Sequence, residues 1–173
     1  MTEKQKNIVT TALKLFAEKG YDATSTSLVA KNANVSEGLI FRHFNNKEGL
    51  LHAILDLGKK DLEPMYEQLV SIEDPKERIR SIILQLSDVT PAQKQFWKLV
   101  YAMKWQAEIY DDTLSAPFKI ALTASFKKLK YKNPELEAEL LLAMLDGIIT
   151  TMLLKKPKNM NDIIHLLLTK YNL

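Results

Sequence analysis

Hydroxyl, basic and aromatic side chains gather between Thr24 and Lys47, at a spacing suited to contact with phosphates and bases. Residues 24–27 are all Ser or Thr, and Ser36 precedes a second apolar stretch. Because Ser and Thr are preferred at helix N-caps, these positions predict helices over about 26–33 and 37–44. The unpaired backbone N–H groups of a helix N-terminus bind phosphate. Two such helices, joined by about three residues around Asn34, form a helix-turn-helix unit.

The second of these helices is predicted to have one buried and one exposed face. Ile40 and Phe44 are four residues apart and are expected to point into a small core. The opposite face then carries Glu37, Gly38, Phe41 and Arg42. A short helix that exposes a guanidinium, an aromatic ring and a glycine can enter the DNA major groove with its first turn at the base edges.

A helix over residues 4–19 is expected to support this pair. Ile8, Ala12 and Phe16 recur at helical spacing, and Gly20 stands where the helix would end. We therefore predict a three-helix DNA-binding domain over residues 1–46. A longer helix begins at Lys47 and opens a second domain over residues 47–173, with a kink or break expected near Pro64.

The charge distribution agrees with a nucleic-acid-binding N-terminal domain. The chain has a net charge of +3, and residues 1–47 hold seven basic and four acidic side chains. Residues 48–173 hold 17 of each sign, so they are neutral. A basic module joined to a neutral one is typical of a protein whose first part contacts a polyanion, although an imbalance of three charges also arises by chance.

Two stretches of sequence resemble a known family. Residues 15–24 read LFAEKGYDAT, and residues 33–48 read ANVSEGLIFRHFNNKE. Over residues 8–51 the chain resembles TetR-type transcriptional regulators in the spacing of its apolar residues. The resemblance includes Gly20 and Gly38, the Val-Ser pair at 35–36 and the pattern Phe-x-x-Lys-Glu at 44–48. The resemblance implies a homodimer that binds a palindromic DNA operator and, usually, a small-molecule inducer that weakens that binding.

The resemblance also implies a role for each matching position. Contacts to phosphate would come from Thr24, Thr26, Ser36, His43 and Lys47, with Ser36 also capping the recognition helix. Contacts to the bases would come from Ser27, Glu37, Gly38, Leu39, Phe41 and Arg42, with Arg42 as the main donor.

Three of these positions depart from the family pattern. Asn34 replaces the usual Gly and can occupy a left-handed turn at modest cost. Phe41 replaces the usual Tyr, so a phosphate hydrogen bond is lost and packing against a sugar or a thymine methyl remains. Glu37 often aligns with Lys or Gln; it can accept a hydrogen bond from a cytosine amino group but repels phosphate. The operator sequence and affinity therefore stay open.

The second domain is expected to be helical throughout, which makes the chain all-α with about nine helices. One predicted helix, over 91–111, has Trp97, Tyr101 and Trp105 on one face. The candidate residues for an apolar effector pocket are Trp97, Tyr101, Met103, Trp105, Phe118, Phe126 and Met144. Each of them is also compatible with an ordinary hydrophobic core.

A helix over about 134–154 is apolar on almost every side. Such a helix is buried on every side, which favours one face on the core and another on a partner. Gly147 in its middle costs about 1 kcal/mol relative to Ala and therefore suggests close packing. The candidate dimer-interface residues are Leu140, Ala143, Gly147, Thr151, Leu154 and Leu167. The alternative is the central core helix of a monomer.

Composition argues against catalysis, metals and membranes. The chain has no Cys and three His, which excludes disulfides, thiol catalysis and Cys-ligated metals. The pairs Glu48/His52 and Asp162/His165 do not complete a di-iron pattern. No apolar run approaches 18 residues and no signal peptide is visible, so we expect a cytoplasmic, non-enzymatic protein without a cofactor. The alternative function is a helical lipid or small-molecule carrier, or an interaction module, that does not bind DNA.

Overall fold

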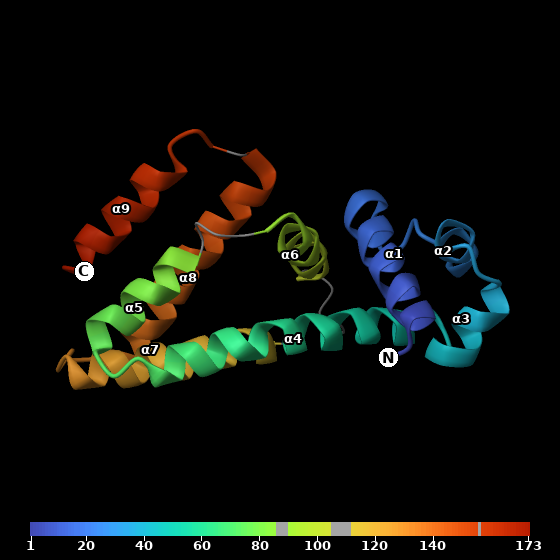
Figure 1. The fold of residues 1–173 in the computed structure, drawn as a ribbon. Coiled ribbons are helices and arrows are strands. Elements are labelled where there is room, and N and C mark those ends of the chain that lie inside the picture. The colour runs from blue at the N-terminus through green and yellow to red at the C-terminus, as the bar shows by residue number, and fades with distance from the viewer. Residues whose placement is uncertain (86–89, 105–111, 156) are drawn as a thin grey trace. The chain divides into compact units, whose positions relative to one another are not determined.

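The computed structural model describes residues 1–85, 90–104, 112–155 and 157–173 (Figure 1). Within these ranges the regular structure consists of nine α-helices and the short 3-10 helix η2 (Asp112–Leu114), so the all-α prediction is confirmed. None of the helices in these ranges is long and apolar enough to cross a membrane.

Two compact units divide the chain. The first comprises Met1–Leu62 and Pro91–Tyr110, and the second comprises Glu63–Thr90 and Asp111–Leu173. The chain passes from the first to the second within α4 (Lys47–Ser71), and no break separates the residues on either side of Pro64. The predicted domain division at residue 46 stays a prediction.

Three short-to-medium helices form the N-terminal part of the first unit (Figure 1). They are α1 (Glu3–Lys19), α2 (Thr26–Ala33) and α3 (Glu37–Phe44). Phe16 of α1, Val29 of α2 and Ile40 of α3 are almost completely buried and fill the core that these helices share. Gly20 ends α1 with a φ of 92°, a backbone conformation that favours glycine.

The first unit also contains α6 (Pro91–Met103), which packs against the first part of α4. A Cβ atom added to Gly58 of α4 would lie 2.1 Å from the ring of Phe96 in α6, so the absence of a side chain at Gly58 makes room for that ring. The helix predicted over 91–111 thus ends at Met103. Residues 105–111 of that prediction, including Trp105, lie outside the described residues.

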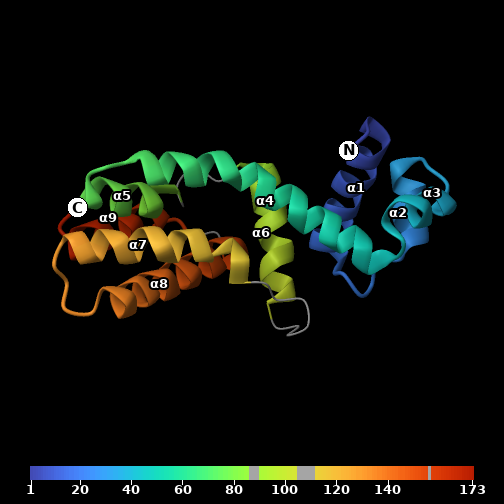
Figure 2. The same cartoon turned by 90° about the horizontal axis from the view of Figure 1, so that it is seen from below.

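The second unit is a helical bundle of α5 (Pro75–Leu84), α7 (Ala116–Lys128), α8 (Pro134–Lys155) and α9 (Met160–Lys170) together with the end of α4. Within it α7 and α8 lie side by side (Figure 2). Leu122, Phe126 and Leu141 are fully buried in its core. The ring of Phe126 contacts those of Tyr131 and Tyr171, with centroid distances of 4.8 and 5.6 Å.

A buried arginine closes the C-terminal end of α4 within the second unit. Arg78 is 9% exposed, and its Nε donates to the carbonyl of Leu69 at 3.1 Å. Its Nη2 donates to the carbonyls of Val70 and Ile72. Because the last carbonyls of a helix lack intrahelical partners, Arg78 satisfies polar groups that would otherwise be costly to bury.

Candidate nucleic-acid interface

The turn between α2 and α3 has the backbone geometry of a helix-turn-helix. Asn34 ends α2 in the left-handed region at φ 54°, ψ 48°, which confirms the prediction for this residue. The N–H of Val35 donates to the carbonyl of Ala30 at 3.0 Å and reverses the chain. Ser36 is the N-cap residue of α3, but its side chain makes no capping hydrogen bond. Its exposed hydroxyl therefore does not cap α3.

The two faces of α3 differ as the sequence predicted. Ile40 is fully buried and Phe44 is 9% exposed, whereas Arg42 is exposed and Phe41 is 48% exposed. Figures 1 and 2 both show α2 and α3 at one end of the first unit and α6 at the other. The outer face of α3 thus presents a cation and an aromatic ring to solvent.

Gly38 lies on this outer face, in the first turn of α3. A Cβ atom added there would have no neighbour within 4 Å, and the φ of Gly38 is not positive. Neither packing within the chain nor backbone strain therefore requires a glycine. The missing side chain of Gly38 would therefore affect only the approach of another molecule to α3.

Thr24 does not lie where the resemblance implied. Its side chain is fully buried, and its hydroxyl donates to the carbonyl of Gly20 at 2.8 Å and faces that of Leu15 at 3.4 Å. Thr24 closes the loop after α1, and Ser25 instead caps α2 by accepting from the N–H of Leu28 at 3.1 Å. A hydroxyl without solvent exposure cannot hold a phosphate, so the prediction for Thr24 is wrong.

Thr26 and Glu37 are bonded to each other. The Thr26 hydroxyl donates to Glu37 Oε1 at 2.6 Å, which joins the first residue of α2 to the first residue of α3. Both residues are half-buried. The resemblance implied separate DNA contacts for them, and helical periodicity does not relate residues that lie on two different helices.

Lys47 at the start of α4 is held by the loop between α1 and α2. Its Nζ donates to the carbonyls of Tyr21 at 3.0 Å and Asp22 at 3.4 Å, and lies 4.2 Å from the centroid of the Tyr21 ring. Burial, followed by the nearby carboxylates of Glu48 and Asp22, raises the pKa of Tyr21. Lys47 therefore fixes the position of the loop, whatever else its ammonium group contacts.

His43 on α3 is oriented by α1. Gln5 Oε1 accepts the backbone N–H of Thr2 at 2.8 Å, so the Gln5 amide nitrogen is the atom that faces His43 Nδ1 at 3.2 Å. That nitrogen donates, so Nδ1 must accept. The proton of a neutral His43 then resides on Nε2, which leaves this exposed imidazole an N–H donor.

The candidate effector residues divide between the two units. In the first unit Met103 is buried, and Trp97 and Tyr101 are half-buried. In the second unit Phe118 and Met144 are half-buried against the core, while Phe126 is fully enclosed by it. The ring of Phe126 packs against those of Tyr131 and Tyr171 in the core, and its assignment to an effector pocket stays a prediction.

One face of α8 is apolar and uncovered within the second unit. Leu140 is 52% exposed and Leu154 is 76% exposed, and Ala143 and Gly147 between them are also exposed. Thr151 is half-buried, and its hydroxyl donates to the carbonyl of Gly147 at 2.9 Å.

The dimer-interface prediction for Leu167 of α9 is wrong. Leu167 is 6% exposed and belongs to the core of the second unit. Its neighbour Leu166 is 69% exposed and takes the outward position instead.

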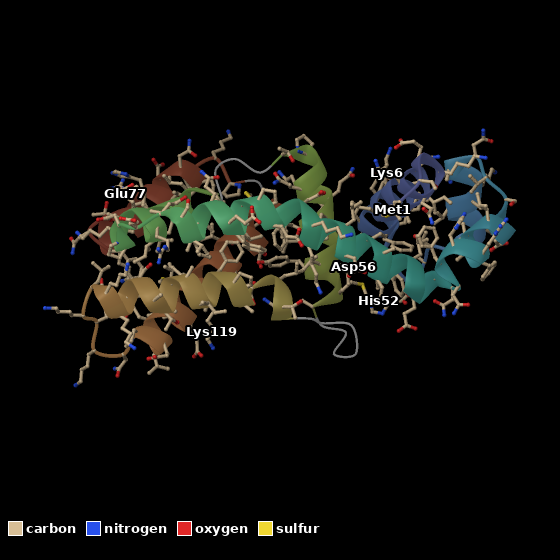
Figure 3. All side chains as sticks on the ribbon, turned by 60° about the horizontal axis from the view of Figure 1, so that its bottom comes forward. Met1, Lys6, His52, Asp56, Glu77 and Lys119 are labelled. Atoms are coloured by element: carbon tan, nitrogen blue, oxygen red, sulfur yellow. The ribbon has the colours of Figure 1, made fainter. Side chains whose placement is uncertain are left out.

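The acid–histidine pairs are solvated. His52 Nε2 lies 3.8 Å from Glu48 Oε1, with both side chains more than 60% exposed. Figure 3 shows His52 and Asp56 extending from one side of α4. Asp162 and His165 are exposed as well. In the described part of the chain, His, Asp and Glu nowhere gather in the groups of three that would hold a metal ion.

Comparison with known proteins places this site in a family. The family described as bacterial regulatory proteins, tetR family, matches residues 8–54. YvkB of Bacillus subtilis (strain 168), described as an uncharacterized HTH-type transcriptional regulator, is 43% identical over 39% of this chain and 36% of YvkB. The HTH-type transcriptional regulator HbdR of Aromatoleum sp. (strain CIB) is 32% identical over 57% of this chain and 44% of HbdR. The matched part thus spans less than half of either relative.

Solved structures share the whole fold. A transcriptional regulator from Rhodococcus sp. Rha1 has a TM-score of 0.80 at 22% identity, over 98% of this chain and 95% of that one. The fatty acid degradation regulator FadR from Bacillus halodurans has a TM-score of 0.72 at 20% identity, over 97% and 96% of the two chains.

The fold and site define the class: this is an all-helical protein with an N-terminal helix-turn-helix. Within that class, residues 8–54 match the TetR family of bacterial regulatory proteins, and the fold of the chain is that of solved transcriptional regulators. The family consists of transcriptional regulators rather than enzymes.

Proposed function

We propose that this protein is a DNA-binding transcriptional repressor that binds a palindromic operator as a homodimer in the cytoplasm. The observation that carries the proposal is the outer face of α3, where Gly38, Phe41 and Arg42 are exposed although Ile40 and Phe44 are buried. A short helix with this division of faces enters the major groove, and its N-terminal turn contacts the base edges.

The donors around α3 suit the two kinds of contact that a specific interface needs. Arg42 supplies the planar, bidentate donor that recognises guanine O6 and N7. The exposed hydroxyl of Ser36, the Nε2–H of His43 and the remaining hydrogen of Lys47 Nζ can bind phosphate oxygens, and the exposed hydroxyl of Ser27 can contact the bases. Phosphate contacts fix the register, and Arg42 then selects the sequence.

Fluorescence anisotropy with the DNA that flanks the protein's own gene tests the proposal. We expect tighter binding to one flanking duplex than to a scrambled duplex of equal length, and an affinity that falls as salt rises, because Lys and Arg release counterions from phosphate. Equal affinity for the two duplexes, or no salt dependence, would contradict it.

The exposed apolar face of α8 supports the homodimer. Leu136, Leu140 and Leu154 of α8 and Leu166 of α9 are all more than half exposed. Contiguous exposed apolar surface marks an interaction site in a protein that dissolves in water. A second copy of the same face would cover it about a two-fold axis, with Gly147 allowing close approach of the two helices.

A small apolar or amphipathic effector is proposed to release the DNA. The half-buried aromatic residues Trp97 and Tyr101 on α6 support a site of this chemistry, since pockets for such molecules are lined mainly by apolar and aromatic side chains. Binding would shift α4 and change the separation of the two recognition helices, which must match one DNA turn of about 34 Å. A thermal-shift screen of small apolar compounds, followed by DNA release, tests this step.

Gly38→Ala separates DNA binding from stability. We expect unchanged or slightly higher stability, by up to about 1 kcal/mol, because Ala restricts the unfolded chain and meets no atom in the fold. DNA affinity should fall at least tenfold if the helix backbone lies against the base edges. Thermal unfolding and anisotropy measure the two effects.

Ala124→Gly is the matched control for Gly38→Ala. Ala124 is an exposed residue in the middle of α7, in the second unit. We expect this variant to lose about 1 kcal/mol of stability and to bind DNA normally. If Gly38→Ala bound DNA as tightly as the wild type, α3 would not approach the bases through this residue.

Lys47→Ala is expected to weaken binding to every duplex and to reduce the salt slope by about one unit, as the loss of one phosphate contact requires. Tyr21→Leu is the control, because it removes the ring beneath the ammonium group and keeps the charge. An unchanged slope in Lys47→Ala would leave Lys47 with only its structural bonds to the loop.

A further inference from the structure

We infer that Thr26 and Glu37 act together as one recognition element, which selects a cytosine in each half of the operator. The inference rests on the proposed function, since it assigns a base preference to the interface described above. Glu37 is the residue that accepts from the base, and Thr26 is the residue that positions it.

The bond between the two residues determines what Thr26 can do. A threonine hydroxyl has one proton, and at 2.6 Å that proton is donated to Glu37 Oε1. Phosphate oxygens only accept, so Thr26 cannot donate to phosphate while it holds Glu37. A hydrogen bond from a hydroxyl to a carboxylate is short and strong, which makes this pairing the favoured use of Thr26.

The same bond fixes the carboxylate of Glu37. A free Glu side chain samples many rotamers, and restricting them normally costs free energy on binding. Here Oε1 is tied to α2 and the side chain is half-buried before any DNA arrives. The first turn of α3 also favours a negative charge, because the helix dipole is positive there. Oε2 is the carboxylate oxygen that this bond leaves as an acceptor.

Cytosine is the base that fits a fixed carboxylate. In the major groove cytosine presents a single donor, its N4 amino group, whereas guanine and thymine present acceptors that repel the charge. Adenine presents an amino group beside the N7 acceptor, which disfavours a carboxylate and suits an amide instead. The charge also repels phosphate, so the element lowers non-specific binding as well.

Selection from a pool of random duplexes with the full chain tests the inference. The variants are Glu37→Gln, Thr26→Val and Thr26→Ser. The wild type should enrich a cytosine at one position of each half-site, and exchanging that C·G pair for T·A should weaken binding roughly 5- to 150-fold. Glu37→Gln should move the preference at this position toward adenine, because an amide pairs with adenine N6 and N7.

The two Thr26 variants separate positioning from folding. Thr26→Val keeps the shape and removes the proton, so the cytosine preference should decline while the preference for the bases selected by Arg42 stays. Thr26→Ser keeps the hydroxyl and should restore the wild-type preference. Thermal unfolding of each variant shows whether it is folded, and a general loss of stability would weaken all base preferences equally.

The same experiment distinguishes a failure of this inference from a failure of the proposed function. If Glu37→Gln still enriches cytosine at this position, Glu37 does not recognise it. If Thr26→Val keeps the full preference, Thr26 is not the positioning residue. If the wild type enriches no sequence at all, the proposed function fails and this inference fails with it.

Discussion

Arg42→Ala is expected to lower the affinity for the operator by about 1–3 kcal/mol, which is the contribution of a good base contact. The effect should appear mainly on the specific duplex, because Arg42 lies on the exposed side of α3, opposite the buried Ile40 and Phe44, and is proposed to contact the bases. Binding to scrambled DNA should change little. Anisotropy titrations on both duplexes at one salt concentration measure the difference.

Two further variants make the Arg42 result specific. Arg42→Lys keeps the charge and loses the planar fork, so it should lose specificity and keep the salt slope. Arg80→Ala removes the same kind of side chain from α5, where Arg80 is paired with Glu77 at 3.1 Å, and should leave DNA binding unchanged. An Arg42→Ala protein that selected its operator normally would exclude Arg42 as the base-contacting residue.

Leu140→Glu is expected to convert the proposed dimer to a monomer and to reduce operator affinity by about 10²–10⁴-fold, because two linked recognition helices bind far more tightly than one. Leu140 is 52% exposed on the apolar face of α8, so a charge there should not harm the fold of the second unit. In a dimer interface the same charge would be buried next to its counterpart. Sedimentation measures the mass, and anisotropy measures the DNA affinity.

Ile120→Glu is the control for Leu140→Glu. Ile120 is 70% exposed on α7, outside the apolar face of α8, and its replacement should change neither mass nor affinity. A wild-type protein that is monomeric at the concentrations at which it binds DNA would contradict the proposed dimer. If the Leu140→Glu protein remained dimeric, the dimer interface would not include Leu140.

The sequence predicted the elements of the first unit because their signals are local. Apolar residues at helical spacing identified the buried side chains Phe16, Ile40 and Phe44, and Asn34 marked a left-handed turn. The exposed side of α3 followed from its buried side. Each of these inferences depends only on the identity of residues that are close together in the sequence.

The side-chain partners could not be predicted, because they depend on contacts between distant residues. Thr24 and Thr26 have the same residue type two positions apart, yet one hydroxyl is buried against α1 and the other is bonded to Glu37. Arg78 has the sequence context of a surface charge in a helix and instead binds the carbonyls at the end of α4.

The error at Leu167 has a different physical origin. Residues 163–168 are apolar at five of six positions, so periodicity does not establish which of them face the core. Only the packing of α9 in its unit shows that Ile164, Leu167 and Leu168 lie inside and Leu166 outside. A run of similar residues carries little information about helix orientation.

Dimethyl sulfate footprinting on the preferred duplex tests the central claim most directly, because the reagent modifies guanine N7 in the major groove, where Arg42 is proposed to bind. We expect two protected patches on one side of the duplex, with centres about 34 Å apart, and loss of both patches in Arg42→Ala. Binding without protection of any guanine N7, or with a single patch, would contradict the placement of two recognition helices in successive major grooves.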